Sequence, residues 1–401
     1  MLSKQRELSA PFDPIPGSEL RYRWRTESEF AYLNESARPE MAEVRRCYRE
    51  WLSRYPDDAR PDLVRRFRDE DDRKHTAAAF ELALHEALVR LSGRPRALLP
   101  TRERTTYEFD VTIDGEDAAV EATVANVESN EARKARRRRE AVLDHLDQAP
   151  HARFAIHVWE LSETPEQQAS LSKLRNQLHR MLDGFSADDA AHLARQVAAG
   201  EYDDLPRCTI ERPGIRLVCS PVPLPPLAAV NPESVPNRRQ IEDLPVPAPM
   251  LSFPIGKAIQ ENARQKAEKR YALGERPLIL SLACTHWAGA SSFEVIRGLF
   301  GTTRWPVRIV EGRREVGAPF FDRDGVWAPH SRNRSTSVSA LIVVPHFTSA
   351  DIPPSDWCAY VNPWPRTPAP KWLRQLPHYR ENAEGHYMFH PGTSLSALLA
   401  T

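Results

Sequence analysis

The stretch that most constrains the fold runs from residue 107 to residue 124, with the sequence YEFDVTIDGEDAAVEATV. Its first half alternates apolar side chains with acids and a threonine, which is the period-two pattern of a strand with one apolar face. Asp114-Gly115 comes next, and an Asp-Gly pair is a strong signal for a short turn. Residues 119–124 follow as a second extended segment. The stretch therefore predicts a β-hairpin whose polar face carries acids.

Two of these acids, Asp110 and Glu121, fall on neighbouring strands of the predicted hairpin. In one interpretation they are ordinary solvent-facing residues of a half-exposed antiparallel pair. In the other they form a metal site, because hard cations such as Mg²⁺ prefer oxygen ligands and are often held by one or two carboxylates. Composition alone does not separate the two interpretations.

A helix is predicted just ahead of the hairpin, over residues 76–91. Glu81 and His85 lie one turn apart on a shared face of this helix.

A helix with an acid, a strand with an acid, a turn, and a second acid on the next strand together resemble the PD-(D/E)XK, or restriction-endonuclease-like, superfamily. The resemblance implies an α/β fold with a restriction-endonuclease-like mixed sheet flanked by helices, an N-terminal helical cap and a C-terminal α/β extension. It also implies that Asp110 and Glu121 bind Mg²⁺ or Mn²⁺, that Glu81 adds a further metal or second-layer contact, and that the protein hydrolyses phosphodiester bonds, with DNA as the expected partner.

The chain is also similar to uncharacterised bacterial proteins that share five short phrases with it in the same order. No function follows from that similarity. The phrases are Phe30-Ala31-Tyr32-Leu33, Phe80-Glu81-Leu82, Val120-Glu121-Ala122-Thr123, the segment from Lys266 to Tyr271, and Asn362-Pro363.

The hairpin departs from the superfamily pattern at two positions. Phe109 stands before the first acid in place of proline, and an alignment without a gap would make Glu108 the first acid. Thr123 stands in place of the motif lysine, whose ammonium orients the attacking water and offsets charge in the transition state. Lys134 and Lys266 are the two candidates to supply that charge from elsewhere in the chain.

A basic run follows the hairpin, on a helix expected over residues 131–148. Six of the seven residues from 133 to 139 are basic: Arg133, Lys134, Arg136, Arg137, Arg138 and Arg139. Such a run is either a solvated helix face or a clamp for a phosphate backbone. The run lies directly after the hairpin, so the more specific hypothesis is nucleic-acid binding. The residues that would bind are Arg133, Lys134, Arg136 and Arg137.

Composition limits the classes of protein to which the chain can belong. The 401 residues carry 55 basic and 55 acidic side chains, so a nucleic acid would have to be bound by local patches and not by a global field. The five cysteines are scattered and lack paired spacing, which argues against a disulfide framework or a structural zinc and favours a reducing cytoplasm. No apolar run long enough for a signal peptide or a membrane span is found.

We predict four regions along the chain. They are an N-terminal helical region at 1–72, a nuclease-like α/β core at 73–220, a proline-rich connector at 221–254, and a C-terminal α/β region at 255–401. Residues 154–159 are expected to add a strand to the hairpin's sheet, and residues 277–284 and 338–344 to form buried strands.

Two functions from different classes remain open. The first is a metal-dependent nuclease that uses Glu81, Asp110, Glu121, Thr123 and Lys266. The alternative is a catalytically inactive nuclease-fold module that binds nucleic acid or protein, which Thr123 and the neutral net charge favour. A small-molecule enzyme using His286, at the end of a buried strand, is a weaker third hypothesis.

Overall fold

The computed structural model describes most of the chain. The described residues are 10–13, 19–97, 107–125, 128, 130–164, 170–224, 241, 255–269, 271–285, 290–301, 303–304, 307–310, 313–316, 320–321, 324–327, 336–352, 356–383 and 386–399. Contacts divide the chain into two compact units. Unit 1 comprises Met1–Gly17, Ser28–Val127 and Phe253–Thr401, and unit 2 comprises Ser18–Glu27 and Glu128–Ser252.

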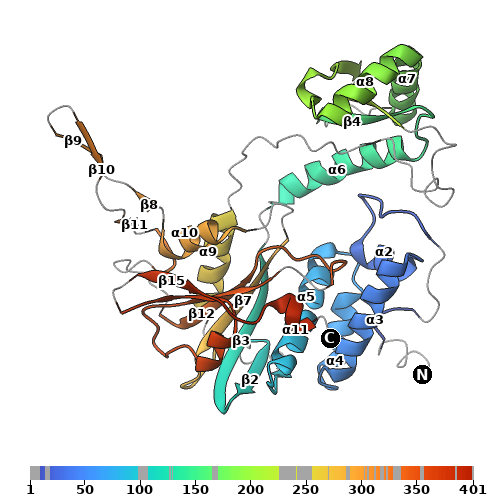
Figure 1. The fold of residues 1–401 in the computed structure, drawn as a ribbon. Helices are drawn as coiled ribbons and strands as arrows, with labels where there is room; N and C mark the ends of the chain where they lie inside the picture. Colours follow the sequence, from blue (N-terminus) through green and yellow to red (C-terminus); the bar gives the residue numbers. More distant parts are fainter. Residues whose placement is uncertain are drawn as a thin grey trace. The chain divides into compact units, whose positions relative to one another are not determined.

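Unit 1 is built on a mixed sheet of eight strands in the order β1-β2-β3-β7-β12-β13-β14-β15 (Figure 1). The strands are β1 (Arg96–Ala97), β2 (Phe109–Ile113), β3 (Glu116–Ala125), β7 (Leu278–Cys284), β12 (Val338–Val344), β13 (Cys358–Val361), β14 (His378–Glu381) and β15 (Tyr387–His390). β3, β7 and β12 run parallel, while β2 and β13 pair antiparallel on either side of them. The expected mixed α/β sheet flanked by helices is confirmed at this level.

The predicted hairpin is formed by β2 and β3. Asp114 and Gly115 take φ values of 52° and 78° between Ile113 and Glu116, which face each other. Two consecutive positive φ values are the requirement of the tight turn that Asp-Gly favours. β7 and β12 are buried along their whole length, as central strands of a covered sheet should be.

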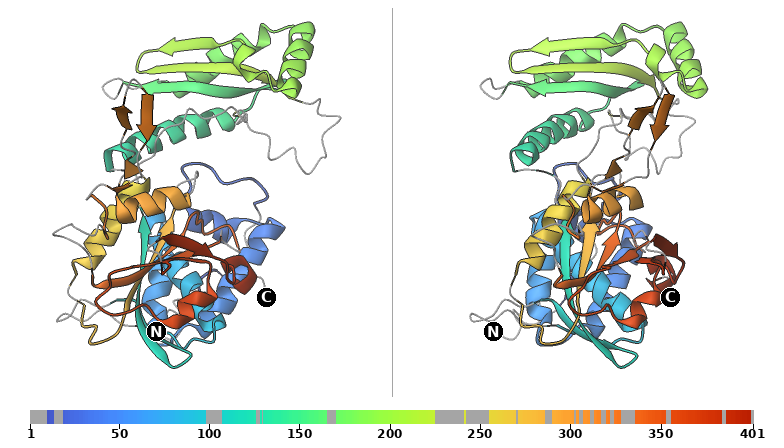
Figure 2. Two further views of the ribbon diagram at one scale, coloured as in Figure 1. Left: turned by 60° about the vertical axis from the view of Figure 1, so that its left-hand side comes forward. Right: turned by 90° about the vertical axis from the view of Figure 1, so that its left-hand side faces the viewer.

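One face of the sheet is covered by the N-terminal helices, seen from three sides in Figures 1 and 2. Phe109, Val111 and Ile113 of β2 enter this core. The helices are α2 (Glu29–Glu35), α3 (Pro39–Arg54), α4 (Arg60–Phe67), α5 (Asp72–Arg90) and the C-terminal α11 (Leu395–Leu399). The expected N-terminal helices and the helix before the hairpin are therefore present, but they share one hydrophobic core with the sheet and do not form a separate cap.

The other face of the sheet is covered by α9 (Ile255–Ala267) and α10 (Ser292–Phe300). Ala119 of β3 and Leu278, Leu280 and Leu282 of β7 point into this second core. Because strand residues alternate between faces, Glu121 belongs to the same face as Ala119. That face is the one from which α9 reaches β3.

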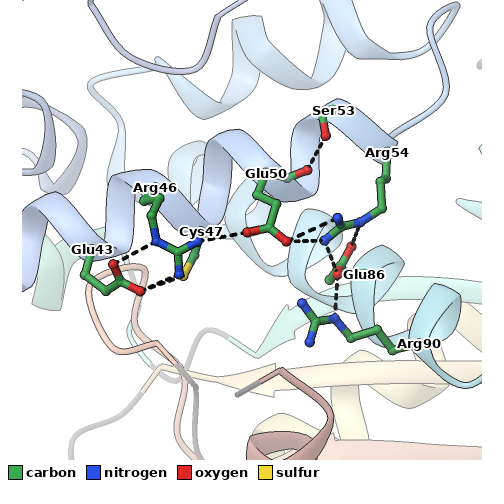
Figure 3. Close-up of polar contacts among 8 residues, drawn as sticks. All are labelled: Glu43, Arg46, Cys47, Glu50, Ser53, Arg54, Glu86 and Arg90. Carbon is green, nitrogen blue, oxygen red and sulfur yellow. Dashed lines mark hydrogen bonds and ion pairs between the residues drawn. The ribbon is translucent and has the colours of Figure 1, made fainter. Parts of the chain in front are cut away.

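A charged network joins α3 to α5 (Figure 3). Glu86 is fully buried and accepts hydrogen bonds from Arg54 Nε at 2.9 Å and from Arg90 Nε at 2.6 Å. Arg54 and Arg46 bind Glu50 from either side along α3. A buried carboxylate is tolerated here because two guanidinium groups surround it.

Unit 2 has a sheet of its own, in the order β4-β6-β5. Its elements are α6 (Asn130–Asp147), β4 (Phe154–Glu163), α7 (Leu171–Asp183), α8 (Ala187–Ala199), β5 (Cys208–Arg212) and β6 (Ile215–Pro223). Helix residues such as Leu146 and Leu178 form its core with Phe154 and Leu217. The prediction that residues 154–159 extend the hairpin's sheet is wrong, since β4 pairs with β6 and β3 pairs with β7.

The observed division of the chain differs from the four predicted regions. The hairpin and the C-terminal strands β7 and β12 belong to one sheet, and unit 2 is inserted between them. Most of the proline-rich segment at 221–254 lies outside the described residues. Within the described part of the chain, no helix is both long and apolar enough to cross a membrane.

Candidate functional site

Two glutamates face each other across β2 and β3. The antiparallel register pairs Phe109 with Val120, so Glu108, one residue earlier, lies opposite Glu121. The backbone N–H of Ala122 donates to Glu108 Oε2 at 2.9 Å, which fixes the Glu108 carboxyl beside β3. The structure therefore places Glu108 next to Glu121, as the alignment without a gap requires.

The two carboxyl groups hold different charges. Burial and the neighbouring Glu121 carboxylate raise the pKa of Glu108 well above its ordinary value. Burial also opposes ionisation of Glu121, but the protonated neighbour Glu108 and the Lys266 ammonium hold the pKa of Glu121 below its ordinary value. Like charges at this separation disfavour joint ionisation, so Glu121 ionises more readily than Glu108.

Two lysines at the C-terminal end of α9 supply positive charge to this acid pair: Lys266 in its last turn and Lys269 just beyond it. Lys266 Nζ forms an ion pair with Glu121 Oε1, and Lys269 Nζ lies 3.7 Å from the same oxygen. The side chain of Glu121 is 1% exposed, that of Lys266 16% and that of Lys269 39%. Glu121 raises the pKa of Lys266 despite the opposing effect of burial, so this ammonium stays charged.

Two buried oxygens at the site have no hydrogen-bond partner among the described residues. They are Oε2 of Glu121 and the hydroxyl of Tyr271. Burial and the Glu121 carboxylate raise the pKa of Tyr271, so this hydroxyl remains protonated. An unpaired buried carboxylate oxygen costs free energy unless a proton, a water or a cation satisfies it.

Asp110, on β2, has different surroundings from Glu108, which directly precedes that strand. Its carboxylate accepts from the Tyr107 hydroxyl at 2.7 Å and from Arg96 at 2.6 Å, and it forms an ion pair with Arg276. Burial opposes ionisation, but these donors hold the pKa of Asp110 below its ordinary value. A carboxylate with three donors is already satisfied, which favours Glu108 over Asp110 as the first acid of the motif.

Glu81 lies near enough to the acid pair for its charge to help raise the pKa of Glu108. It lies on α5, which packs against the opposite face, and its carboxylate accepts from Tyr55 at 2.6 Å and from Arg66 at 2.7 and 3.1 Å. Both oxygens are therefore engaged. The expectation that Glu81 contacts a metal stays a prediction, since Tyr55 and Arg66 engage its oxygens while its charge acts on Glu108.

The remaining predicted residues fall at separate places. Thr123 lies two residues beyond Glu121 on the same face of β3, half-buried. Lys134, Arg136 and Arg137 are exposed on α6 in unit 2, and Arg133 is half-exposed there. Arg136 is paired with Glu128 and Glu140. His286 lies outside the described residues.

Sequence reasoning missed five residues around the acid pair: Tyr107, Lys269, Tyr271, Arg96 and Arg276. Lys269 and Tyr271 follow Lys266 within one short segment, and that spacing was the available signal. No pattern in the sequence points to Arg96 or Arg276, because both reach Asp110 only through strand pairing. In the part of the chain that the structure describes, no group of three or more His, Cys, Asp or Glu side chains could hold a metal ion.

The arrangement is a pair of carboxyl groups, one of them ionised, beside a buried ammonium. It can hold a cation through oxygen ligands, and it can place a positive charge near an anionic group. Comparisons of the chain with family models, with curated proteins and with solved structures returned no match.

Proposed function

We propose that the protein is a metal-dependent phosphodiester hydrolase of the PD-(D/E)XK type, with DNA as its substrate. The observation that carries the proposal is the Glu108–Glu121 pair with Lys266 Nζ on Glu121. The order of a helix, a two-stranded hairpin and a parallel third strand supports the restriction-endonuclease-like fold. These are the parts that the superfamily resemblance leads one to expect, with Lys266 in place of the motif lysine.

The donor set fits a hard divalent cation. Two carboxyl groups supply oxygens, and Glu121 Oε2 is buried without a hydrogen-bond partner among the described residues. Glu108 and Glu121 would hold Mg²⁺ or Mn²⁺, which when bound lowers the pKa of water and offsets the charge of the phosphate. Loss of the Glu108 proton would accompany cation binding.

The chain's own residues would have three roles in the reaction. The ammonium group of Lys266 is fixed in position, since its side chain is largely buried and paired with Glu121. Such a fixed cation stabilises negative charge that develops on the phosphate oxygens. Lys269, which is more exposed, lies where an approaching phosphate would meet it first. Thr123, without charge, adds a hydroxyl on the same face.

Cleavage of plasmid DNA by the pure protein tests the proposal. The wild-type chain should nick or linearise the plasmid with Mg²⁺ or Mn²⁺ and not with EDTA. Glu121→Gln and Glu108→Gln should each reduce the rate at least about 100-fold, since each removes a charged oxygen ligand. The matched control is Glu43→Gln, an exposed glutamate of α3. Equal cleavage by Glu121→Gln and the wild type would refute the proposal.

A second function is an inactive nuclease-fold module that binds nucleic acid or protein. Thr123 favours it, and so does the lack of a third acid at the pair among the described residues. DNA binding by a wild-type protein that cleaves nothing with either metal would support this alternative.

We propose a reducing compartment, the cytoplasm, as the setting. The five cysteines are free thiols. Two of them, Cys208 and Cys219, lie opposite each other on β5 and β6. Thiols so placed remain reduced only where the surroundings favour reduction.

A further inference from the structure

Asp110 joins two arginines that come from distant parts of the chain. Arg96 lies directly opposite Asp110 in the pairing of β1 with β2, and Arg276 lies two residues before β7. Arg276 Nε donates to the backbone carbonyl of Leu273 at 3.0 Å, and its guanidinium lies 5.7 Å from the centre of the Tyr107 ring. The cluster is held by the strand register, by a turn and by an aromatic ring.

The cluster carries a net positive charge. The carboxylate of Asp110 forms ion pairs with both Arg96 and Arg276. The Tyr107 hydroxyl donates to Asp110 Oδ1 at 2.7 Å. Two guanidinium groups against one carboxylate leave about one unit of positive charge. The Arg96 side chain is 73% exposed and that of Arg276 35%, so the charge faces solvent.

The cluster lies one strand repeat from the acid pair on the same face of the sheet. Arg96, Asp110 and Ala119 form one row across the strands. Glu121 lies two residues further along β3, beside Glu108, whose carboxyl accepts from the N–H of Ala122. Two residues along a strand span about 7 Å. Tyr107 and Tyr271 connect this row to the acid pair, with ring centres 6.0 Å apart. One polynucleotide strand is long enough to contact both at once.

We propose that Arg96 and Arg276, oriented by Asp110, form a binding site for a backbone phosphate next to the one held at the acid pair. Guanidinium groups bind phosphate with two parallel hydrogen bonds, and a fixed orientation reduces the entropy lost on binding. Asp110 is then a positioning residue for the arginines and not a metal ligand. This inference rests on the proposed function, of which it specifies how the substrate is bound.

Binding of a short fluorescein-labelled DNA duplex, measured by anisotropy over a range of KCl concentrations without divalent metal, tests this site apart from cleavage. Arg96→Gln should weaken binding several-fold and reduce the slope of log Kd against log salt by about 0.9, the value for one phosphate. Arg276→Gln should act in the same direction. The matched control is Arg46→Gln, an exposed, ion-paired arginine of α3 in the same unit, which should leave the slope unchanged.

The outcomes separate this inference from the proposed function. A lower slope for Arg96→Gln, in a protein that cleaves nothing, supports the phosphate site and contradicts the hydrolase. If the wild type cleaves DNA, and Arg96→Gln and Arg46→Gln have equal KM values and equal slopes of log Kd against log salt, the phosphate site is refuted. The proposed hydrolase activity is then still supported. Circular dichroism of each variant checks its fold. Arg96 gives the decisive result because its exposed side chain contributes little to packing.

Discussion

At the scale of single residues, two carboxyl groups only two positions apart in the sequence take opposite roles. Burial and the facing Glu121 carboxylate raise the pKa of Glu108, whereas Tyr107 and two guanidinium groups lower the pKa of Asp110. The difference lies in the neighbours that strand pairing supplies. A charge assignment at this site therefore follows from register and not from residue type.

Lys266 should matter more to catalysis than Lys269. We expect Lys266→Met to lower kcat for DNA cleavage about 100-fold, the usual loss when one charged group that stabilises the transition state is removed. Lys269→Met should raise KM with a smaller change in kcat, because this ammonium is more exposed and farther from Glu121. Steady-state kinetics on one DNA duplex distinguishes the two. A kcat loss from Lys269→Met that equals the loss from Lys266→Met would contradict the assignment.

His85 should make the stability of unit 1 depend on pH. Burial lowers the pKa of His85 to about 4, below its ordinary 6.5. Between these values the unfolded chain binds a proton that the folded chain does not, so stability is full above pH 6.5 and falls as the pH approaches 4, by about 3 kcal/mol.

The variant His85→Leu isolates this contribution from that of other histidines. Urea unfolding at pH 7, 5.5 and 4.5 should give a midpoint that falls less steeply for His85→Leu than for the wild type. Parallel declines in the two proteins would show that His85 is not the group responsible.

At the scale of elements, the network in Figure 3 joins α3 to α5 through a buried charge. We expect Glu86→Gln to destabilise unit 1 by about 2–3 kcal/mol, because Arg54 and Arg90 then lose their shared buried counter-ion. Glu43→Gln, which removes an exposed partner of Arg46 on α3, is the control and should leave the unfolding midpoint where it is. Equal midpoints for the two variants would mean that the buried carboxylate adds nothing.

The elements themselves were largely predictable from the sequence. The alternation at residues 107–113, the Asp-Gly turn and the apolar run at 278–284 each depend on local rules, and each is present in the structure. The strand at 154–163 was also detected, but its sheet was not. Long-range contacts determine which strands pair, so the sequence of a single strand does not identify its partner.

At the scale of the whole chain, long-range contacts also explain why the sequence alone does not identify every residue of the site. Arg276 lies 166 positions from Asp110 and Lys266 lies 145 from Glu121, so only the fold brings them together. Lys266 was one of two candidates, and the structure gives it the contact with Glu121. Glu81 precedes the hairpin on α5, which packs against the opposite face of the sheet, and its charge still acts on Glu108.

Unit 1 should fold without unit 2. Its two cores contain residues from both sides of the insertion, and Ala125 and Ile255 lie in the same hydrophobic cluster. A short flexible linker in place of residues 128–252 should therefore leave a cooperative unfolding transition. The replacement should also weaken DNA binding, because it removes the basic residues 133–139 of α6. A chain that unfolds without cooperativity after this replacement would show that the insertion is needed for the fold.

We propose that Glu121, with Glu108 and not Asp110, holds a divalent cation. Calorimetric titration of Mn²⁺ into the wild-type protein, Glu121→Gln and Asp110→Asn tests it directly and without a substrate. We predict a saturable heat for the wild type and for Asp110→Asn, and none for Glu121→Gln. No heat from the wild type, or a heat that Glu121→Gln keeps and Asp110→Asn loses, would contradict the account.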